Sequence, residues 1–195
     1  MKTSKGQSIK ICVSGAAAGK SIARAARDAE RLGAMIAKQG AMLLTGATTG
    51  LPLYAARGAK RAGGFVFGFS PAGTRAEHTK KYRLPLNFLD LVVFTGAGYS
   101  GRNLILTRSS DAVIVVGGRI GTLNEFTVAF EDRKVIGILE GSGGITDEIK
   151  DILKVAGKGK RHVVFASDPD KLIKKVIAEV KLSGRHNHIQ GRREA

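Results

Sequence analysis

The stretch "DAVIVVGGRIGTLNEF" (residues 111–126) joins an unbroken apolar run to a double glycine and then to a helical pattern. A run of consecutive apolar residues indicates a strand that is buried on both faces, as in a parallel sheet. Glycines at the end of such a strand permit a tight turn and a close approach of the backbone to a ligand. The stretch therefore predicts a strand–turn–helix unit whose turn is a candidate binding site.

The same alternation continues on both sides of this unit. Further apolar runs of strand length occupy residues 9–15, 41–46, 65–70, 89–96, 135–141 and 162–167. Helical patterns lie between the strands, at about residues 20–39, 52–62, 101–108, 122–133, 146–156 and 169–182. Strand–helix repetition predicts an α/β fold, a Rossmann-like doubly wound and mostly parallel sheet of about seven strands flanked by helices.

The chain of 195 residues is long enough for one domain with a substantial core. We expect residues 1–182 to form a single Rossmann-like nucleotide-binding domain and residues 183–195 to form a basic, disordered tail. The segment 70–88 has weak periodicity and two prolines, which makes it a candidate lid or substrate loop. No apolar run reaches the roughly 18 residues that a bilayer requires, so we expect a cytoplasmic protein with no membrane partner.

The formal net charge is +16, and the basic residues are spread along the chain. Such a field attracts phosphates, nucleic acid or acidic surfaces, but it is equally consistent with a solubilising surface. The single cysteine, Cys12, lies in the first apolar run and is expected to be a small buried residue.

A second glycine-rich stretch, "VSGAAAGKS" (residues 13–21), ends in Gly-Lys-Ser, as the P-loop of nucleotide triphosphatases does. The P-loop pattern places four residues between its two glycines, whereas three separate Gly15 from Gly19. The loop length matters because successive backbone N–H groups must wrap one phosphate. We therefore interpret the stretch as a turn into a helix N-terminus, with Lys20 and Ser21 in the first helical turn.

Two interpretations fit Thr122-Leu-Asn-Glu125, which follows the double glycine. The first is a phosphate site in which Thr122 and the free N–H groups of a helix start hold the anion, with Glu125 near the ligand. The second is a capping box, in which Thr122 and Glu125 satisfy those N–H groups without a ligand. A second glycine-rich strand end, "TGATTG" (residues 45–50), favours the site.

These motifs resemble a known family. "DAVIVVGGRIGTLNE" is similar to the P-G-G-x-G-T-x-x-E motif of the LOG group, the cytokinin riboside 5′-monophosphate phosphoribohydrolases. "TGATTGLPLYAARGAKRAGG" resembles the glycine-rich segment of that group, and "GRN" (residues 101–103) resembles its Arg-Lys position. The resemblance is collinear over about residues 9–140. The nearest branch is that of the LOG-like Rossmann proteins that include molybdenum-cofactor carriers.

The resemblance implies functional residues. Arg102 would bind the phosphate or ribose side of a nucleotide, and Glu125 would polarise the sugar or activate water, as the catalytic pair. The implied phosphate-binding and nucleotide-binding residues are Gly15, Gly46, Thr48, Thr49, Gly50, Gly117, Gly118, Gly121 and Thr122. A carboxylate suits the oxocarbenium-like charge of N-glycosidic cleavage, and arginine suits a planar anion.

Three departures from the motif bear on activity. Val116 replaces its proline, Asn103 replaces its lysine, and Arg119 adds a charge to the loop. Phosphate binding tolerates these changes better than hydrolysis does. The resemblance implies a protein that binds nucleoside 5′-monophosphates and that, as a phosphoribohydrolase, would cleave their N-glycosidic bond. The alternatives are a non-catalytic carrier of a phosphorylated cofactor such as molybdopterin, and a nucleic-acid-binding protein.

The remaining expectations concern partners. No required cofactor and no metal site are expected, and His186 and His188 are interpreted as part of a solvated tail. A small phosphorylated ligand is the expected partner, with non-specific nucleic-acid binding as a further alternative. We also expect a homodimer or a higher oligomer, because the helix at 122–133 carries an excess of apolar residues. These residues are Leu123, Phe126, Ala129 and Phe130; the alternative is that all of them pack on the sheet.

Overall fold

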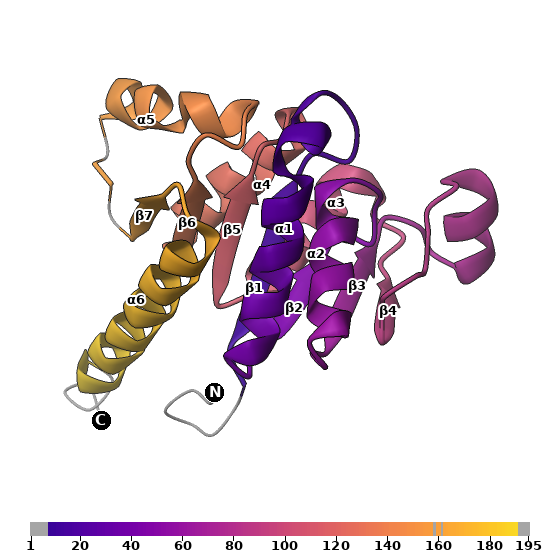
Figure 1. Cartoon of the computed structure of the whole chain (residues 1–195), viewed down its shortest axis with the longest axis horizontal. Helices are drawn as coiled ribbons and strands as arrows, with labels where there is room; N and C mark the ends of the chain where they lie inside the picture. Colours follow the sequence, from indigo (N-terminus) through magenta and orange to yellow (C-terminus); the bar gives the residue numbers. More distant parts are fainter. Residues whose placement is uncertain (1–7, 158, 161, 191–195) are drawn as a thin grey trace.

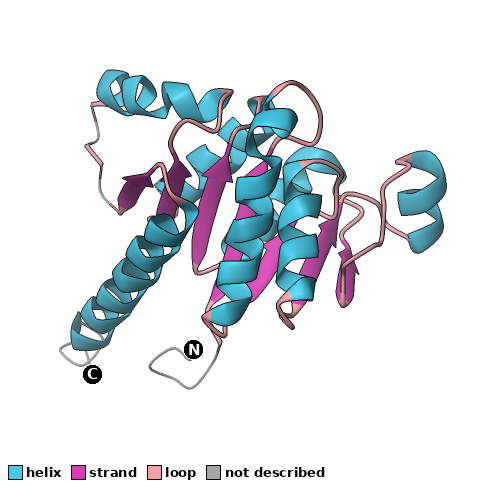
Figure 2. Ribbon diagram, viewed as in Figure 1, coloured by secondary structure: helices cyan, strands magenta, loops and turns pink. Residues whose placement is uncertain are grey.

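The computed structural model describes residues 8–157, 159–160 and 162–190. Its seven strands form one sheet in the order β4-β3-β2-β1-β5-β6-β7, and every neighbouring pair is parallel (Figure 2). The strands are β1 (Lys10–Gly15), β2 (Met42–Thr45), β3 (Val66–Ser70), β4 (Leu91–Phe94), β5 (Ala112–Val116), β6 (Val135–Leu139) and β7 (Val163–Ala166). The predicted fold class is confirmed, and the strand order reverses between β1 and β5, where ligands bind in such sheets.

Helices cover both faces of the sheet (Figure 1). One face carries α1 (Ser21–Lys38), α2 (Leu51–Arg61) and α6 (Pro169–Gln190); the other carries α3 (Gly98–Ser109), α4 (Ile120–Glu131) and α5 (Ile145–Ala156). Successive strand residues point to opposite faces, so Ile11 packs with α1 whereas Cys12, which is buried as expected, packs with α4. Coverage on both sides explains why the strands read as unbroken apolar runs.

The last helix is longer than the sequence pattern suggests. It continues past Leu182, where the predicted domain ends, to Gln190. The predicted basic tail is therefore divided: residues 183–190 extend α6, and residues 191–195 lie outside the described part of the chain. Within the described residues, no helix has the length and the apolar character that a bilayer crossing requires.

Helices α1 and α2 approach each other closely at two glycines. A Cβ atom on Gly33 would lie 1.8 Å from the carbonyl oxygen of Ala55, and one on Gly58 would lie 1.9 Å from that of Glu30. Any side chain at either position would force the helices apart. This contact holds α2 against the middle of α1.

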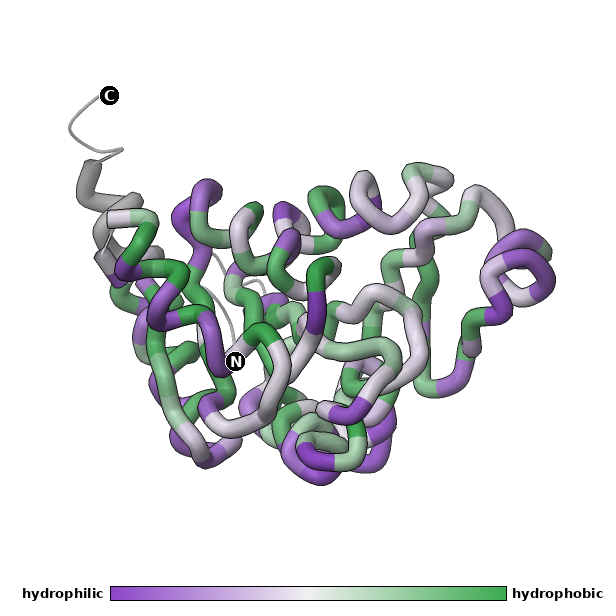
Figure 3. The backbone as a smooth tube through the Cα atoms, turned by 90° about the horizontal axis from the view of Figure 1, so that it is seen from above, coloured by the Kyte–Doolittle hydropathy of each residue, from purple (hydrophilic) through white to green (hydrophobic). Residues whose placement is uncertain are grey.

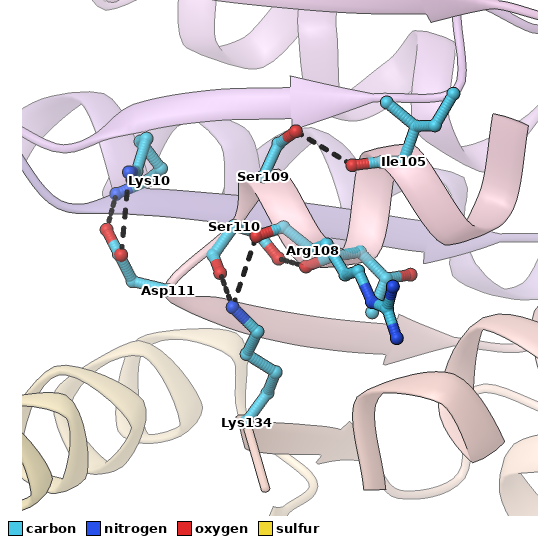
Figure 4. A network of polar contacts seen from close by, with 8 residues as sticks. Lys10, Ile105, Arg108, Ser109, Ser110, Asp111 and Lys134 are labelled. Atoms are coloured by element: carbon cyan, nitrogen blue, oxygen red, sulfur yellow. Dashed lines mark hydrogen bonds and ion pairs between the residues drawn. The ribbon is translucent and has the colours of Figure 1, made fainter. Parts of the chain in front are cut away.

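The polar contacts in Figure 4 lie at the amino ends of the central strands β1 and β5. The Nζ atom of Lys134 donates to the carbonyl oxygens of Arg108 (3.2 Å) and Ser110 (2.7 Å), at the carboxyl end of α3. Burial lowers the pKa of the Lys134 ammonium group. The backbone N–H of Lys10 donates to the Asp111 carboxylate at 2.8 Å. These contacts fix the α3–β5 turn in place. They therefore also fix the carboxyl end of α3.

Segment 70–88, the candidate lid, projects beyond β4 (Figure 1) and contains a short π-helix, Glu77–Lys81, which is hydrophilic (Figure 3). His78 is nevertheless fully buried, and its ring nitrogens contact the Ser70 hydroxyl (2.8 Å) and the Pro85 carbonyl oxygen (3.1 Å). The ring of Tyr82 packs edge-on against that of Tyr99, with centroids 5.5 Å apart. The buried His78 thus fixes the segment to the body of the domain, and the Tyr82–Tyr99 pair joins it to α3.

The apolar residues of α4 do not form the exposed surface that motivated the dimer. Phe126, Ala129 and Phe130 are buried in the core between α4 and the sheet, and Leu123 packs against the same cluster. The apolar residues of α4 that exceed what one side of the sheet requires are buried because α3 and α5 also pack against this cluster. The argument for a dimer from this helix is therefore wrong, and the oligomeric state stays a prediction.

Candidate functional site

A cavity of about 170 Å³ lies at the carboxyl ends of β1 and β2, next to the starts of α3 and α4. It brings together Arg102 and Glu125, the implied catalytic pair, from two different helices. The other predicted residues that line it are Gly15, Gly46, Thr48, Gly121 and Thr122. The position agrees with the rule that ligands bind beyond the carboxyl ends of strands at the switch point.

Arg102 is a buried cation, with only 5% of its surface exposed. Its Nη1 atom donates to the Phe69 carbonyl oxygen at 3.2 Å, whereas its Nε atom has no hydrogen-bond partner among the described residues. Burial lowers the pKa of the guanidinium, but arginine remains protonated in proteins. A buried guanidinium with an unsatisfied donor is a strong attractor for an oxyanion.

Gly46 makes room for this guanidinium. A Cβ atom at position 46 would lie 1.7 Å from Nη1 of Arg102, which is far inside contact distance. The glycine is thus required by a close approach of a side chain rather than by a turn. The sequence pattern marked Gly46 as a ligand contact, and the structure shows that it also positions Arg102.

Glu125 is 7% exposed and points toward β1, where the Ser14 hydroxyl donates a hydrogen bond to its Oε2 atom. Burial raises the pKa of the Glu125 carboxyl, while the Arg102 charge and the Ser14 hydrogen bond lower it. The two charged groups influence each other through space, since no ion pair between Arg102 and Glu125 occurs among the described residues. The net direction favours the protonated acid more than in water.

The capping-box interpretation is wrong. Helix α4 begins at Ile120, its N-cap is Arg119, and no side chain caps it. Thr122 therefore lies inside the helix, and the carboxyl group of Glu125 contacts Ser14 instead of the helix start. Arg119 has an extended backbone conformation, and the helix begins directly after it. The capping box would have required the helix to begin after Thr122. The first turn of the helix consequently has no side-chain cap, and its residues Gly121 and Thr122 line the cavity.

Gly117 and Gly118 do not line the cavity, unlike Gly121 and Thr122. The Gly117 N–H donates to the Ser142 hydroxyl at 2.8 Å, and the Gly118 carbonyl oxygen accepts from the Ile145 N–H at 3.1 Å. Both glycines have positive φ (58° and 100°), a conformation that other residues rarely adopt. They shape the turn that carries α4 to the cavity.

Thr49 and Gly50 line a second cavity, of about 510 Å³. The Thr49 hydroxyl donates to the Ala17 carbonyl oxygen at 2.9 Å, which joins the β2–α2 loop to the β1–α1 loop. Gly50 has φ +73°, and a Cβ atom there would lie 2.1 Å from the Ala16 carbonyl oxygen. The three implied nucleotide-binding residues of the β2–α2 loop are therefore divided between the cavities: Thr48 lines the first, and Thr49 and Gly50 line the second.

Among the lining residues that sequence reasoning did not assign to the site are one hydroxyl and one aromatic ring, those of Ser14 and Tyr99. Ser14 is the one hydroxyl residue in the apolar run that precedes Gly15. A polar residue at the end of a buried strand was the signal that could have identified it. Tyr99 is half exposed, and its ring centroid lies 5.9 Å from Cζ of Arg102. Asn103, which stands in place of the motif's lysine, also lines the cavity and donates to the Asn124 side chain at 3.0 Å.

Other candidates lie away from these cavities. Lys20 of the Gly-Lys-Ser stretch is exposed immediately before α1 and lines neither cavity in the described structure. The described residues contain no group of three or more His, Cys, Asp or Glu side chains that could hold a metal ion. The side chains of His186 and His188 lie outside the described part of the chain.

Solved structures share this fold over most of the chain. TM1055 is 27% identical with a TM-score of 0.75, covering 88% of this chain and 99% of its own. The molybdenum cofactor binding protein of Rippkaea orientalis is 29% identical with a TM-score of 0.73, covering 88% and 98%. The molybdenum cofactor carrier protein of Chlamydomonas reinhardtii is 29% identical with a TM-score of 0.70, also covering 88% and 98%.

DNA processing protein A of Helicobacter pylori is 16% identical with a TM-score of 0.62 over 88% of this chain and 81% of its own, which shows the fold alone. A protein of Archaeoglobus fulgidus with no described function is 36% identical over 114 residues, which are 58% of this chain and 70% of that protein. These likenesses agree with the LOG-like motifs at the cavity. The chain belongs to the SLOG cluster4 family, which it matches over residues 8–173.

Proposed function

We propose that the chain binds a small phosphorylated ligand and acts as its carrier. The observation that carries this proposal is the Arg102 guanidinium, buried in the first cavity with its Nε atom lacking a partner among the described residues. Burying a cation without a full set of acceptors costs free energy, and an oxyanion ligand would recover that cost.

The rest of the cavity suits an anion. The first turn of α4 has no side-chain cap and lines the cavity at Gly121 and Thr122, where free N–H groups and the positive end of a helix dipole favour an anion. The charged residues of the lining are Arg102, Arg119 and Glu125, and burial favours the neutral form of Glu125. The lining is therefore net positive, as a phosphate group requires.

A phosphorylated pterin is the ligand class that the relatives suggest, because two of the similar solved structures, each 29% identical to this chain, are named for the molybdenum cofactor. The phosphate end of such a cargo fits the donor set of this chain. The unpartnered Nε atom of Arg102 and the space that Gly46 leaves beside the guanidinium supply the anchoring point. Molybdopterin is thus proposed as cargo rather than as a resident cofactor.

Phosphoribohydrolase activity is the second candidate, and the presence of Glu125 in the same cavity favours it. Stabilising an oxocarbenium-like transition state requires the ionised carboxylate. In this chain, burial raises the pKa of Glu125, and one of its oxygens already accepts the Ser14 hydrogen bond. For this reason we propose a carrier function first and catalysis second.

Calorimetry with matched ligands tests the binding proposal. Nucleoside 5′-monophosphates should bind, and the corresponding nucleosides should bind much more weakly. Arg102→Ala should weaken binding about ten- to a hundred-fold, since a charge-assisted contact contributes about 1.5–3 kcal/mol. Arg108→Ala is the matched control, because Arg108 lies on the same helix and pairs with Asp132 at the surface. Equal effects of the two substitutions would refute a phosphate site at Arg102.

A turnover assay separates carrier from enzyme. Purine, pyrimidine and N6-modified monophosphates are incubated with the protein, and free base is quantified by chromatography. A carrier releases none, whereas an enzyme releases base in a Glu125-dependent manner. Nucleic-acid binding rests on charge alone, so its affinity should fall steeply with salt and ignore sequence. A tight, sequence-selective complex at physiological salt would instead favour a nucleic-acid function.

A further inference from the structure

The first cavity is too small for a whole nucleotide-like ligand. Its volume of about 170 Å³ falls below the roughly 300–1,000 Å³ of ordinary small-molecule pockets. It accommodates an anionic group with a short linker, so the rest of the ligand must extend elsewhere. The second cavity, of about 510 Å³, lies within the ordinary range.

The two cavities are neighbours. Ala17 lines both, and consecutive residues of the β2–α2 loop divide between them, Thr48 facing the first and Thr49 the second. The hydrogen bond from Thr49 to Ala17 joins the two loops at the residue that both linings share, and this contact is called the ridge below. A ligand anchored at Arg102 would have to cross this ridge to reach the second cavity.

The second cavity is built for a flat apolar group. Its walls include Ile22, Leu53, Tyr54 and Phe88. The Arg57 guanidinium lies over the Tyr54 ring, 4.7 Å from its centroid. The carboxylate of Glu30 holds it there through bonds to Nε (3.1 Å) and Nη2 (2.6 Å). The ion pair with Glu30 thus fixes the position of Arg57 beside Tyr54, and tyrosine rings and guanidinium groups are side chains on which aromatic rings stack.

Phe88 also lines the second cavity, and its backbone conformation is strained. Its φ of +64° is rare for a bulky residue, and its side chain is nevertheless 40% exposed. The conformation is thus not compensated by complete burial of the ring. Strained residues cluster at ligand sites, where the bound molecule supplies the missing contacts.

We propose that the cavity of Ile22, Leu53, Tyr54 and Phe88 holds the aromatic ring system of the same ligand whose phosphate binds at Arg102. This inference rests on the proposed function, because the ring is placed relative to that phosphate. It identifies the ligand as a phosphorylated, ring-bearing molecule that spans the ridge at Ala17. The ring in this position lies on the α2 side of the switch point, away from Tyr99.

The test compares ribose 5-phosphate with adenosine and guanosine 5′-monophosphates, which add a ring to the same sugar phosphate. The wild type should bind at least one nucleotide about five- to a hundred-fold more tightly than ribose 5-phosphate, as expected for stacking of one base. Tyr54→Ala should abolish most of that ratio and leave the affinity for ribose 5-phosphate unchanged. Phe65→Ala, which replaces an exposed aromatic residue directly before the amino end of β3, should leave the ratio intact.

Phe88→Gly is a second variant with opposite expected effects. Glycine relieves the positive φ, so the melting temperature should rise, while the nucleotide-to-sugar ratio should fall because the ring contact is lost. A variant that merely unfolds cannot give this combination. Tyr99→Ala should retain the ratio.

Three results would overturn the inference: no ring preference in the wild type, a ratio unchanged by Tyr54→Ala and Phe88→Gly, or a ratio abolished by Tyr99→Ala. Each of them leaves phosphate binding at Arg102 standing. If the wild type does not bind ribose 5-phosphate and Arg102→Ala does not affect nucleotide binding, the proposed function itself fails, and the ring site falls with it.

Discussion

Replacing Glu125 by glutamine should make the protein progressively more stable than the wild type as the pH rises. The substitution keeps the size of the side chain and an acceptor for the Ser14 hydroxyl, but it removes the ionisable group. Glu125 is 7% exposed, and burial raises the pKa of its carboxyl above the ordinary value of 4.5. The folded protein therefore binds a proton at Glu125 in a pH range where the unfolded chain has released it.

The sign and the slope follow from proton linkage. Because the folded-state pKa is raised, the contribution of Glu125 to stability is fully present below about pH 4.5 and is lost as the pH rises through the folded-state pKa. One proton gives a slope of at most about 1.4 kcal/mol per pH unit within that window. The free energy of unfolding of Glu125→Gln, minus that of the wild type, should thus increase with pH and then level off.

Urea denaturation monitored by circular dichroism, at pH values from about 5 to about 8, measures this difference. The buffers must be free of phosphate, because an anion at Arg102 would stabilise the folded state by mass action. Glu148→Gln controls for the general loss of a negative charge, since Glu148 is exposed in the first turn of α5. Stability curves of Glu125→Gln and wild type that stay parallel across this range would refute the account of a buried, proton-binding Glu125.

Three further substitutions test other contacts. Gly46→Ala should weaken the binding of phosphorylated ligands in calorimetry, by less than Arg102→Ala does, because its Cβ atom would lie 1.7 Å from the guanidinium and displace it without removing its charge; unchanged affinity would contradict the packing. Gly33→Ala should lower the free energy of unfolding by about 1–3 kcal/mol in urea, since its Cβ atom would lie 1.8 Å from a carbonyl oxygen of α2; a neutral result would show that the helices separate easily. Lys134→Met should cost about 1–2 kcal/mol in the same assay, because two carbonyl oxygens at the end of α3 lose their donor; an equally stable variant would show that solvent replaces this contact.

The fold was largely predictable from local patterns. Seven continuous apolar runs predicted seven strands, and the structure contains a strand within each of them. Such runs arise because helices cover both faces of the sheet, so every residue of a strand avoids water. The glycines at strand ends likewise placed Gly15 and Gly46 at the ligand edge.

The site was predictable in its residues but less so in their roles. Arg102 and Glu125 share one cavity, as the family resemblance implied. Gly117 and Gly118 instead shape the turn, and Thr49 and Gly50 face a second cavity. Residues that are adjacent in the sequence, such as Thr48 and Thr49, can line different cavities. Which cavity each residue lines depends on the helices and loops that pack against it, and these are distant in the sequence.

The sequence by itself determined the α/β class, the order of elements and the edge at which a ligand would bind, since these follow from hydrophobic patterning and from parallel strands ending together. Only the tertiary structure decided that Thr122 is no cap, that the apolar side of α4 is buried, and that Glu125 meets Ser14. The physical reason is sequence separation: Ser14 and Glu125 are brought together by the pairing of β1 with β5, and the free energy of that contact depends on burial that no local pattern records.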